Sequence, residues 1–344
     1  MFIGIGYGQA RNRRVALEDH GWEVFHLDTS PYERWYKDRP FSIWLARLNQ
    51  AFLLLFRYYL VPPRFYRDLT RALEEYKPDV IHIDRGRAIP PSFLVRAREL
   101  GGILLHFLGD DIRMPLCGTR YLYQGISLYD CLFTPRRFQV EEFLQLGARR
   151  AEWEPLATHP QFHYPVDLSS EDRNKYGHPV IFIGSYEAQR AEWMESIANL
   201  GLVIYGNGWH HLRRSSPLRK CWKGREANWE ELPKIYGASR VCITFTRKGS
   251  RDQHDSRSFE IPACKGFMLA ERTDDHLEFF QDGEEFVSFD SPQQLQELAC
   301  RYLKDEMSLE RERIRQRGYE RFLRDHTTTK RIRCEIEVYE ELRS

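Results

Sequence analysis

The stretch DQHDSRSFEIPACKGFMLAERTDDHLEFFQDGEE (residues 252–285) decides the predicted fold of the second half of the chain. Its pattern predicts a polar loop, a short helix that carries Arg257 and Glu260, a buried strand over 267–271 and a second helix from Asp274. A helix start offers N–H groups and a positive dipole end, which suit a phosphate or a polyol. Glu260 lies one turn inside the helix, where its carboxylate can accept two hydroxyl hydrogen bonds.

Strands and helices alternate on both sides of this stretch, a pattern typical of a parallel, doubly wound α/β sheet. The other strands expected in the second half are 180–185, 202–208, 241–246 and 285–290. Ligands of such sheets bind at the carboxyl ends of the strands. Gly184 and Ser185 stand at one such end, where a glycine lets the backbone approach a phosphate and Arg190 can pair with it.

A second sheet of the same kind is predicted for the first half of the chain. Its first strand is expected at 2–8 and its last at 127–136. Its opening is similar to a dinucleotide-binding strand, loop and helix, because glycines follow the first strand and Asp28 ends the second. The expected third glycine is replaced by basic residues: Arg11, Arg13 and Arg14. The sequence therefore disfavours binding of an NAD-type cofactor.

The composition excludes several classes of protein. The chain has 344 residues, enough for two domains, and its 51 basic and 50 acidic residues nearly cancel, which argues against a nucleic-acid partner. The seven cysteines are odd in number and widely spaced, which argues against a disulfide framework and a structural zinc site. The N-terminal MFIGIGYG has no features of a secretory signal. We therefore expect a cytoplasmic protein.

The most apolar stretch is SIWLARLNQAFLLLFRYYLV (residues 42–61). Arg47, Asn49, Gln50 and Arg57 interrupt it, and a membrane-spanning helix would tolerate them poorly. We expect a long amphipathic helix packed on its own domain. The alternative is an interfacial or acceptor-binding surface, with peripheral membrane contact through residues 42–66.

Several fragments, spread over nearly the full length, together resemble one family. They are PDVIHIDRG (78–86), DD (110–111), YDCLFTP (129–135), LATHPQFHYP (156–165), VIFIGSYEAQR (180–190), GNGW (206–209), DSRSFEIPACKGFMLAE (255–271), GEEFVSFDS (283–291) and HTTTKR (326–331). In this order they resemble the CgeB-like (spore-maturation type) glycosyltransferases, within the group 1 nucleotide-sugar transferases of GT-B fold. The resemblance is strongest from 180 to 331.

The resemblance implies two Rossmann-like domains that face a cleft, with a C-terminal helix that crosses back to the first domain. We expect an acceptor domain over 1–165, a donor-nucleotide domain over 166–325 and the returning helix over 326–344. The implied activity is transfer of a sugar from a nucleoside diphosphate sugar, with a UDP-sugar favoured, to a hydroxyl of a glycan, glycolipid or protein. The family further implies no cofactor, no metal, retention of configuration, and a monomer or dimer.

On the donor side, Glu260 matches the second member of the family's Glu-x7-Glu pair, which holds the donor ribose. Asp252 stands at the first position and is a shorter acid, and Lys265 is inserted before the family's glycine. Arg247 and Arg257 are expected to pair with the diphosphate, since an arginine binds phosphate in a bidentate way. The remaining expected donor contacts are Gly184, Ser185, Arg190, Gly206 and Trp209, and the tryptophan either stacks on the base or sugar or closes the core.

On the acceptor side, Asp110 and Asp111 end a predicted strand, and their carboxylates are the candidate catalytic groups. His159, in the stretch between the domains, is a further candidate. Three other interpretations stay open: the two aspartates cap the next helix, they bind a metal as in the other glycosyltransferase fold, or His163 takes the place of His159. Two other functions also stay open. One is a sugar-nucleotide epimerase of the same fold, and the other is a catalytically silent sugar- or nucleotide-binding assembly protein.

Overall fold

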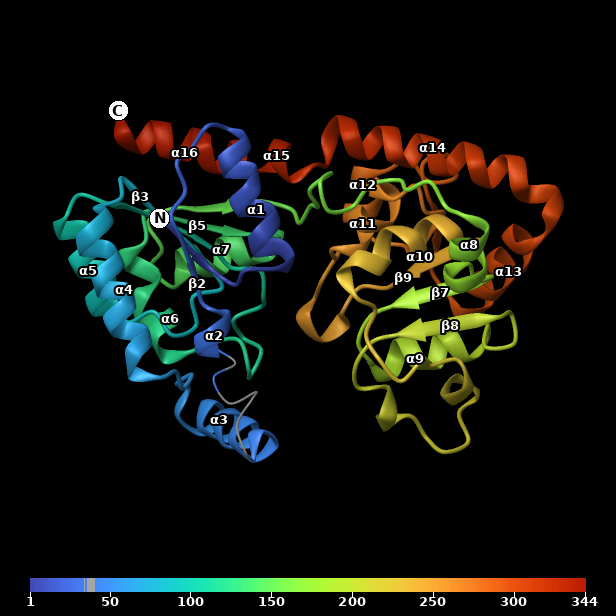
Figure 1. Cartoon of the computed structure of the whole chain (residues 1–344), viewed down its shortest axis with the longest axis horizontal. Coiled ribbons are helices and arrows are strands. Elements are labelled where there is room, and N and C mark those ends of the chain that lie inside the picture. The colour runs from blue at the N-terminus through green and yellow to red at the C-terminus, as the bar shows by residue number, and fades with distance from the viewer. Residues whose placement is uncertain (34, 36–40) are drawn as a thin grey trace. The chain divides into compact units, whose positions relative to one another are not determined.

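The computed structural model describes residues 1–33, 35 and 41–344 and divides the chain into two compact units (Figure 1). Unit 1 comprises Met1–Leu156 with Thr328–Ser344, and unit 2 comprises Ala157–Thr327. The sequence predicted the corresponding boundaries at 165/166 and 325/326. Each unit has its own parallel sheet and its own buried apolar core.

Unit 1 is built on a six-stranded parallel sheet of order β2-β1-β3-β4-β5-β6. Its strands are β1 (Phe2–Gly4), β2 (His26–Asp28), β3 (Val80–Asp84), β4 (Ile103–Phe107), β5 (Cys131–Thr134) and β6 (Ala151–Trp153). The strand order reverses between β1 and β3, as in a doubly wound sheet. The loop after β1 is closed by Asp28, whose Oδ1 accepts the Gly6 N–H at 2.9 Å and the Ser30 hydroxyl at 2.6 Å. Asp28 therefore acts as a turn clasp.

The helices described in unit 1 are α1 (Gly8–Asp19), α2 (Ser30–Glu33), α3 (Ser42–Phe56), α4 (Pro63–Tyr76), α5 (Pro91–Glu99), α6 (Arg120–Gly125), α7 (Arg137–Gln145), α15 (Thr328–Arg331) and α16 (Arg333–Arg343). The last two belong to unit 1 although they end the chain, because α15 packs on α1 and α16 on β4. A 3-10 turn, η1 (Ile126–Leu128), precedes β5.

A buried ionic group fixes α16 to the sheet, and we call it the Arg13 cluster: Arg13, His82, Asp84, Glu154 and Glu335. The Arg13 guanidinium lies 3.3 Å from Asp84, 3.0 Å from Glu154 and 3.2 Å from Glu335. Nε2 of His82 lies 2.6 Å from Glu335. Burial raises the pKa values of all three carboxyl groups, that of Glu335 to about 7, and lowers the pKa of His82 to about 3. One cation thus holds together residues far apart in the sequence.

Unit 2 is built on a five-stranded parallel sheet of order β11-β10-β9-β7-β8. Its strands are β7 (Val180–Ile183), β8 (Leu202–Tyr205), β9 (Val241–Thr244), β10 (Met268–Glu271) and β11 (Val287–Phe289). Its α-helices are α8 (Ser170–Tyr176), α9 (Ala188–Glu195), α10 (Leu232–Ala238), α11 (Arg257–Ala263), α12 (Asp274–Phe279), α13 (Pro292–Leu303) and α14 (Ser308–Asp325). The order reverses between β7 and β9, so a ligand site is expected at the carboxyl ends of these two strands.

The predicted α/β fold with two doubly wound sheets is confirmed. The prediction for 42–61 is wrong, because α3 ends at Phe56 and turns most of its large apolar side chains to solvent. Arg57 adopts the left-handed conformation (φ 60°), and Pro62 and Pro63 follow it, so the helix cannot continue into α4. Residues 42–76 therefore contain two helices, α3 and α4.

Candidate functional site

The loops after β7 and β8 in unit 2 pass so close to each other that a side chain is excluded between them. Gly206 has φ 148°, and a Cβ at this position would lie 1.9 Å from the carbonyl oxygen of Gly184. The same Gly184 oxygen accepts the indole N–H of Trp209 at 2.9 Å. Trp209 is completely buried, so it supports the loop from the core and presents no face for stacking on a ligand. Of the two interpretations of Trp209, its position favours the core.

Arg190, on α9, joins the loops at the reversal point of the sheet. Its guanidinium donates to the carbonyl oxygens of Ser185 at 3.0 Å and Thr246 at 3.2 Å, and it lies 3.2 Å from the Glu187 carboxylate. Burial lowers the pKa of Arg190. The sequence placed Arg190 against a phosphate. In the structure two of its nitrogens hold the backbone that would form the phosphate site, and its buried Nε has no hydrogen-bond partner among the described residues.

Arg257 and Glu260 face the same edge of the sheet from α11. The Arg257 Nε donates to the carbonyl oxygen of Ile183, the last residue of β7, at 3.3 Å. It lies 3.8 Å from Oε2 of Glu260, a long ion pair. Burial acts to lower the pKa of Arg257, but the charge of Glu260, together with smaller contributions from Tyr236 and Asp255, outweighs it, so the net effect raises that pKa. Oε2 of Glu260 is buried and has no hydrogen-bond partner in the described part of the chain.

The first turn of α11 does not offer the open N–H groups that the sequence predicted. The Ser258 N–H donates to Oδ1 of Asp255 at 3.2 Å, while the Phe259 and Glu260 N–H groups donate to the carbonyl oxygen of Ser256. Asp255 and Ser256 therefore cap the helix from its own loop. The contribution of α11 to a ligand site comes from its side chains, Arg257 and Glu260.

A residue that the sequence reasoning missed lies beside Glu260. Tyr236, on α10, is buried, and its hydroxyl has no hydrogen-bond partner within the described residues. Burial and then the negative charge of Glu260 raise its pKa well above the ordinary value. The Tyr236 hydroxyl and the Glu260 carboxylate, both buried and without full hydrogen bonding, thus interact with each other. The pattern of α10 gives no signal for this, since a tyrosine among apolar residues is typical of a core.

The loop between β9 and α11 carries two ion pairs at its start. Arg247 Nε lies 3.0 Å from Oδ2 of Asp252, which is buried. Lys248 Nζ lies 2.6 Å from Oε1 of Glu271, whose other oxygen accepts the backbone N–H and the hydroxyl of Thr246. Asp252, one of the predicted donor contacts, is therefore engaged by Arg247 within its own loop.

The two candidate acids of unit 1 have different surroundings. Asp110 is partly exposed, and its Oδ2 lies 3.3 Å from Arg87 and 3.7 Å from Arg85. Asp111 is buried, and its Oδ1 accepts the Arg113 N–H at 2.9 Å, with the amide of Gln139 at 3.4 Å. Asp111 thus closes the turn after β4, in line with the capping interpretation, although the segment it closes is a turn and no helix. Asp110 is the more accessible acid.

The two histidines of the segment after β6 both belong to unit 2. His159 is buried, and its Nδ1 accepts the Gln161 N–H at 3.2 Å. Nδ1 of His163 lies 2.6 Å from the Thr158 hydroxyl. Thr158 pairs with Thr327 in a parallel bridge, at the two ends of unit 2. Both histidines therefore take part in the local structure around the boundary of the unit.

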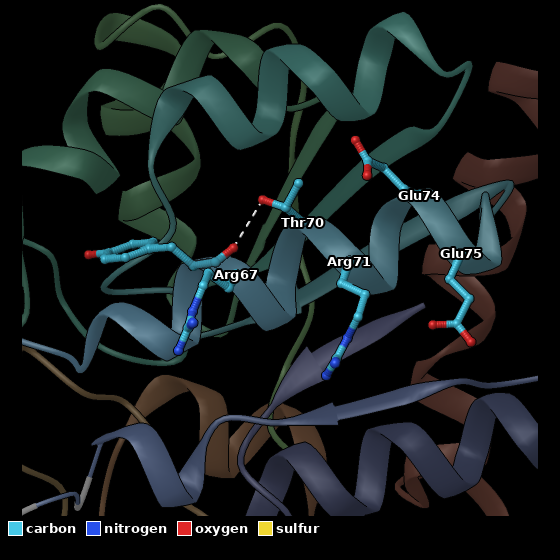
Figure 2. A pocket seen from close by; sticks show the side chains of 6 residues that line it. Arg67, Thr70, Arg71, Glu74 and Glu75 are labelled. Carbon is cyan, nitrogen blue, oxygen red and sulfur yellow. Dashed lines mark hydrogen bonds between the residues drawn. The ribbon is translucent and has the colours of Figure 1, made fainter.

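A shallow depression of unit 1 lies along α4 and contains none of the predicted site residues. Tyr66, Arg67, Thr70, Arg71, Glu74 and Glu75 line it. Figure 2 shows Arg67 and Arg71 pointing to the same side of the helix, while the Thr70 hydroxyl is turned back to the carbonyl oxygen of Tyr66. The basic side chains Arg67 and Arg71 precede the acidic Glu74 and Glu75 along the helix, and nothing in this surface converges on one point.

Comparisons with known proteins agree with this architecture. Residues 189–334, less than half of the chain, match the profile of the family described as Glycosyl transferase-like. No match is found among curated proteins.

Among solved structures, sucrose-phosphate synthase from Thermosynechococcus elongatus is 13% identical, with a TM-score of 0.66 over 99% of this chain and 98% of that one. HepE of Anabaena, solved in complex with UDP and glucose, is 12% identical, with a TM-score of 0.59 over 99% and 91%. The α,α-trehalose 6-phosphate synthase from Burkholderia multivorans is 12% identical, with a TM-score of 0.58 over 99% and 98%. At such identities the likeness concerns the fold. The chain thus has the GT-B fold with two Rossmann-like domains, and its segment 189–334 is similar to the glycosyl transferase-like family.

Proposed function

We propose that this chain is a glycosyltransferase that moves a sugar from a nucleoside diphosphate sugar to a hydroxyl group of a glycan, glycolipid or protein. The observation that carries the proposal is Glu260, a buried carboxylate with one oxygen free of hydrogen bonds, at the reversal point of the unit 2 sheet. A buried carboxylate oxygen without a hydrogen bond costs about 1–3 kcal/mol, which ligand hydroxyl groups would recover. The vicinal hydroxyls of a ribose suit such an acceptor.

The groups around Glu260 suit the rest of a nucleotide sugar. Arg257 is anchored to the end of β7 and supplies positive charge for the diphosphate that leaves during transfer. The Gly184 and Gly206 loops bring backbone close to the same edge, with Arg190 holding their positions. UDP-glucose is the ligand in one HepE structure, which supports a UDP-sugar as the donor of this chain. We assign unit 2 to the donor and unit 1 to the acceptor.

For the acceptor, we propose Asp110 as the carboxylate that orients or deprotonates the attacking hydroxyl. Asp111 keeps the turn after β4 in place, so its role in transfer is one of positioning. His159 stays a candidate for contact with phosphate or acceptor. We further propose retention of configuration and catalysis without a metal, on the resemblance of the Glu260 helix to the retaining, metal-independent members. The CgeB-like subtype rests on the same resemblance.

A second function is favoured by one observation. Asp252 stands where the family has a glutamate, and Arg247 holds its carboxylate. A chain that binds nucleotide sugars without transferring them would tolerate this arrangement. The seven cysteines are free thiols, which suits the cytoplasmic location expected from the sequence, for either function.

The test is a thermal-stability screen against UDP-, GDP-, dTDP- and CDP-sugars, followed by assays of donor hydrolysis and transfer with and without a chelator. A ligand at a hundred times its Kd stabilises the protein by roughly 2.7 kcal/mol. We expect a shift with one donor class, turnover that a chelator leaves unchanged, and a product with the anomeric configuration of the donor by NMR. Binding without turnover would favour the silent protein, and no shift with any donor would reject both functions.

A further inference from the structure

Helix α3 presents an apolar surface to solvent. We call it the α3 surface, and it consists of large side chains that are 49–75% exposed: Ile43, Trp44, Leu48, Leu54, Leu55 and Phe56. Figure 1 shows α3 projecting from one end of unit 1, apart from the helices that cover the sheet. Scattered exposed apolar residues are ordinary, but a contiguous group on one short helix marks an interaction site.

The polarity of α3 is inverted with respect to a helix packed on its own domain. Its buried residues are Asn49 and Leu53. The Asn49 side chain accepts the Leu60 N–H at 3.0 Å and donates to the Leu60 carbonyl oxygen at 3.3 Å, so a polar residue fixes the inner side. At 100° per residue, Trp44 and Leu55 lie on the opposite, outer side. The outer side is therefore the more apolar one.

The charged residues of the stretch that carries the α3 surface all have one sign. No aspartate or glutamate occurs in the sequence from 41 to 67. Four arginines of the same stretch are exposed: Arg47, Arg57, Arg64 and Arg67. Positive charge beside exposed apolar side chains is the combination that anionic lipid headgroups and the underlying acyl chains recognise.

We propose that the α3 surface binds an anionic lipid membrane, with α3 lying in the plane of the interface. The apolar side chains enter the boundary between headgroups and acyl chains, Trp44 takes an interfacial position, and the arginines contact lipid phosphates. A helix of 15 residues is too short to cross a bilayer, and none of the described helices is long and apolar enough to do so. A second copy of the chain would bring like-charged arginines together in a symmetric contact, which favours the lipid.

The test is flotation of the full chain with vesicles of phosphatidylcholine, with and without phosphatidylglycerol, in the absence of any nucleotide sugar. We expect binding to the anionic vesicles that decreases with added salt, because headgroup attraction is screened. A double variant, Trp44→Gln with Leu55→Gln, should lower the partition coefficient about a hundredfold, since each buried side chain contributes about tenfold. Arg47→Gln should weaken binding only to the anionic vesicles.

The matched control is Leu309→Gln, the same change at an exposed leucine of α14 in unit 2. It should leave vesicle binding unchanged. Circular dichroism and donor binding are measured for each variant to check that its fold is retained. Because vesicle binding is measured without a nucleotide sugar, its failure is distinguishable from failure of the proposed function. Equal flotation of the wild type and the double variant would overturn the proposal. The proposal would also be overturned if the wild type did not float with the vesicles. This holds whether or not the wild type forms a dimer that the double variant turns into a monomer.

Discussion

At the scale of single residues, the structure separates side chains that can meet a ligand from those that hold the site together. Glu260 and Arg257 belong to the first kind, because one keeps a free oxygen and the other is partly exposed. Arg190 and Trp209 belong to the second, because their polar groups hold loop carbonyl oxygens. From sequence the two kinds look alike, since all four side chains lie in the loops and helices that follow strands. Hydrogen bonding and burial, which depend on the folded chain, tell them apart.

The two acids of unit 1 give the first prediction. Asp110→Asn should slow transfer by about a hundredfold or more, as expected for loss of a general base, while donor affinity stays the same. Asp111→Ala should lower the unfolding temperature, because it removes the acceptor of the Arg113 N–H and of the buried Gln139 amide, and an unpaired buried donor costs about 1–3 kcal/mol. Steady-state kinetics and thermal unfolding of both variants check this. Full transfer activity in Asp110→Asn would remove that residue from the reaction.

At the scale of elements, the placement of α11 depends on a buried polar network. His276 Nε2 lies 2.7 Å from the Ser258 hydroxyl, and its Nδ1 lies 2.8 Å from the carbonyl oxygen of Glu271. His254 lies 2.6 Å from Asp275. The network connects α11 to the end of β10 and to α12. Ser258 and His276 are 18 residues apart, and His254 and Asp275 are 21 apart, so the prediction of α11 itself was possible and the prediction of these supports was not.

This network gives a prediction about pH. Burial lowers the pKa of His276, so below its ordinary value of 6.5 the unfolded chain binds a proton that the folded chain does not. Stability from His276 is therefore present above pH 6.5 and falls as the pH decreases. His276→Gln should lower the unfolding temperature at pH 8, and the gap to the wild type should narrow at pH 5. His210→Gln, at an exposed histidine of unit 2, is the control and should show no such narrowing.

At the scale of the whole molecule, the alternation of strands and helices was enough to predict two doubly wound sheets, because the buried strands are continuous apolar runs. The same pattern did not predict the inverted polarity of α3, because an apolar helix looks alike whether its apolar side faces a core or a lipid. Nor did it predict the Arg13 cluster. Arg13 drew attention only as a replacement for a glycine, and its partner Glu335 lies at the other end of the chain.

The Arg13 cluster gives a prediction for how the chain end is held. Burial, opposed by the charge of Arg13, raises the pKa of Glu335 from 4.5 to about 7. Between these values the folded chain binds a proton that the unfolded chain releases, so stability falls as the pH rises through this window, by about 3 kcal/mol in total. The unfolding temperature of Glu335→Gln minus that of the wild type should therefore increase from pH 5 to pH 8. Glu337→Gln, exposed on the same helix, should not.

Removal of the central cation should have the opposite effect. Arg13→Met leaves three buried carboxyl groups without their common partner, a change that costs about 3–5 kcal/mol for a buried ion pair. We expect a lower unfolding temperature for unit 1 with donor binding by unit 2 retained. Differential scanning calorimetry with and without the donor separates the unfolding of unit 1 from donor binding by unit 2. An unfolding temperature equal to that of the wild type would show that the cluster contributes nothing to holding α16.

Calorimetric titration with the donor from the stability screen measures whether Glu260 binds the donor nucleotide. Glu260→Gln keeps the shape of the side chain and removes its charge, so we predict an affinity lower by about 1–3 kcal/mol, roughly five- to 150-fold in Kd. The control Glu278→Gln, the same change at an exposed position of α12, should bind like the wild type. An unchanged Kd in Glu260→Gln, with the wild type binding the donor, would show that Glu260 does not bind the donor nucleotide.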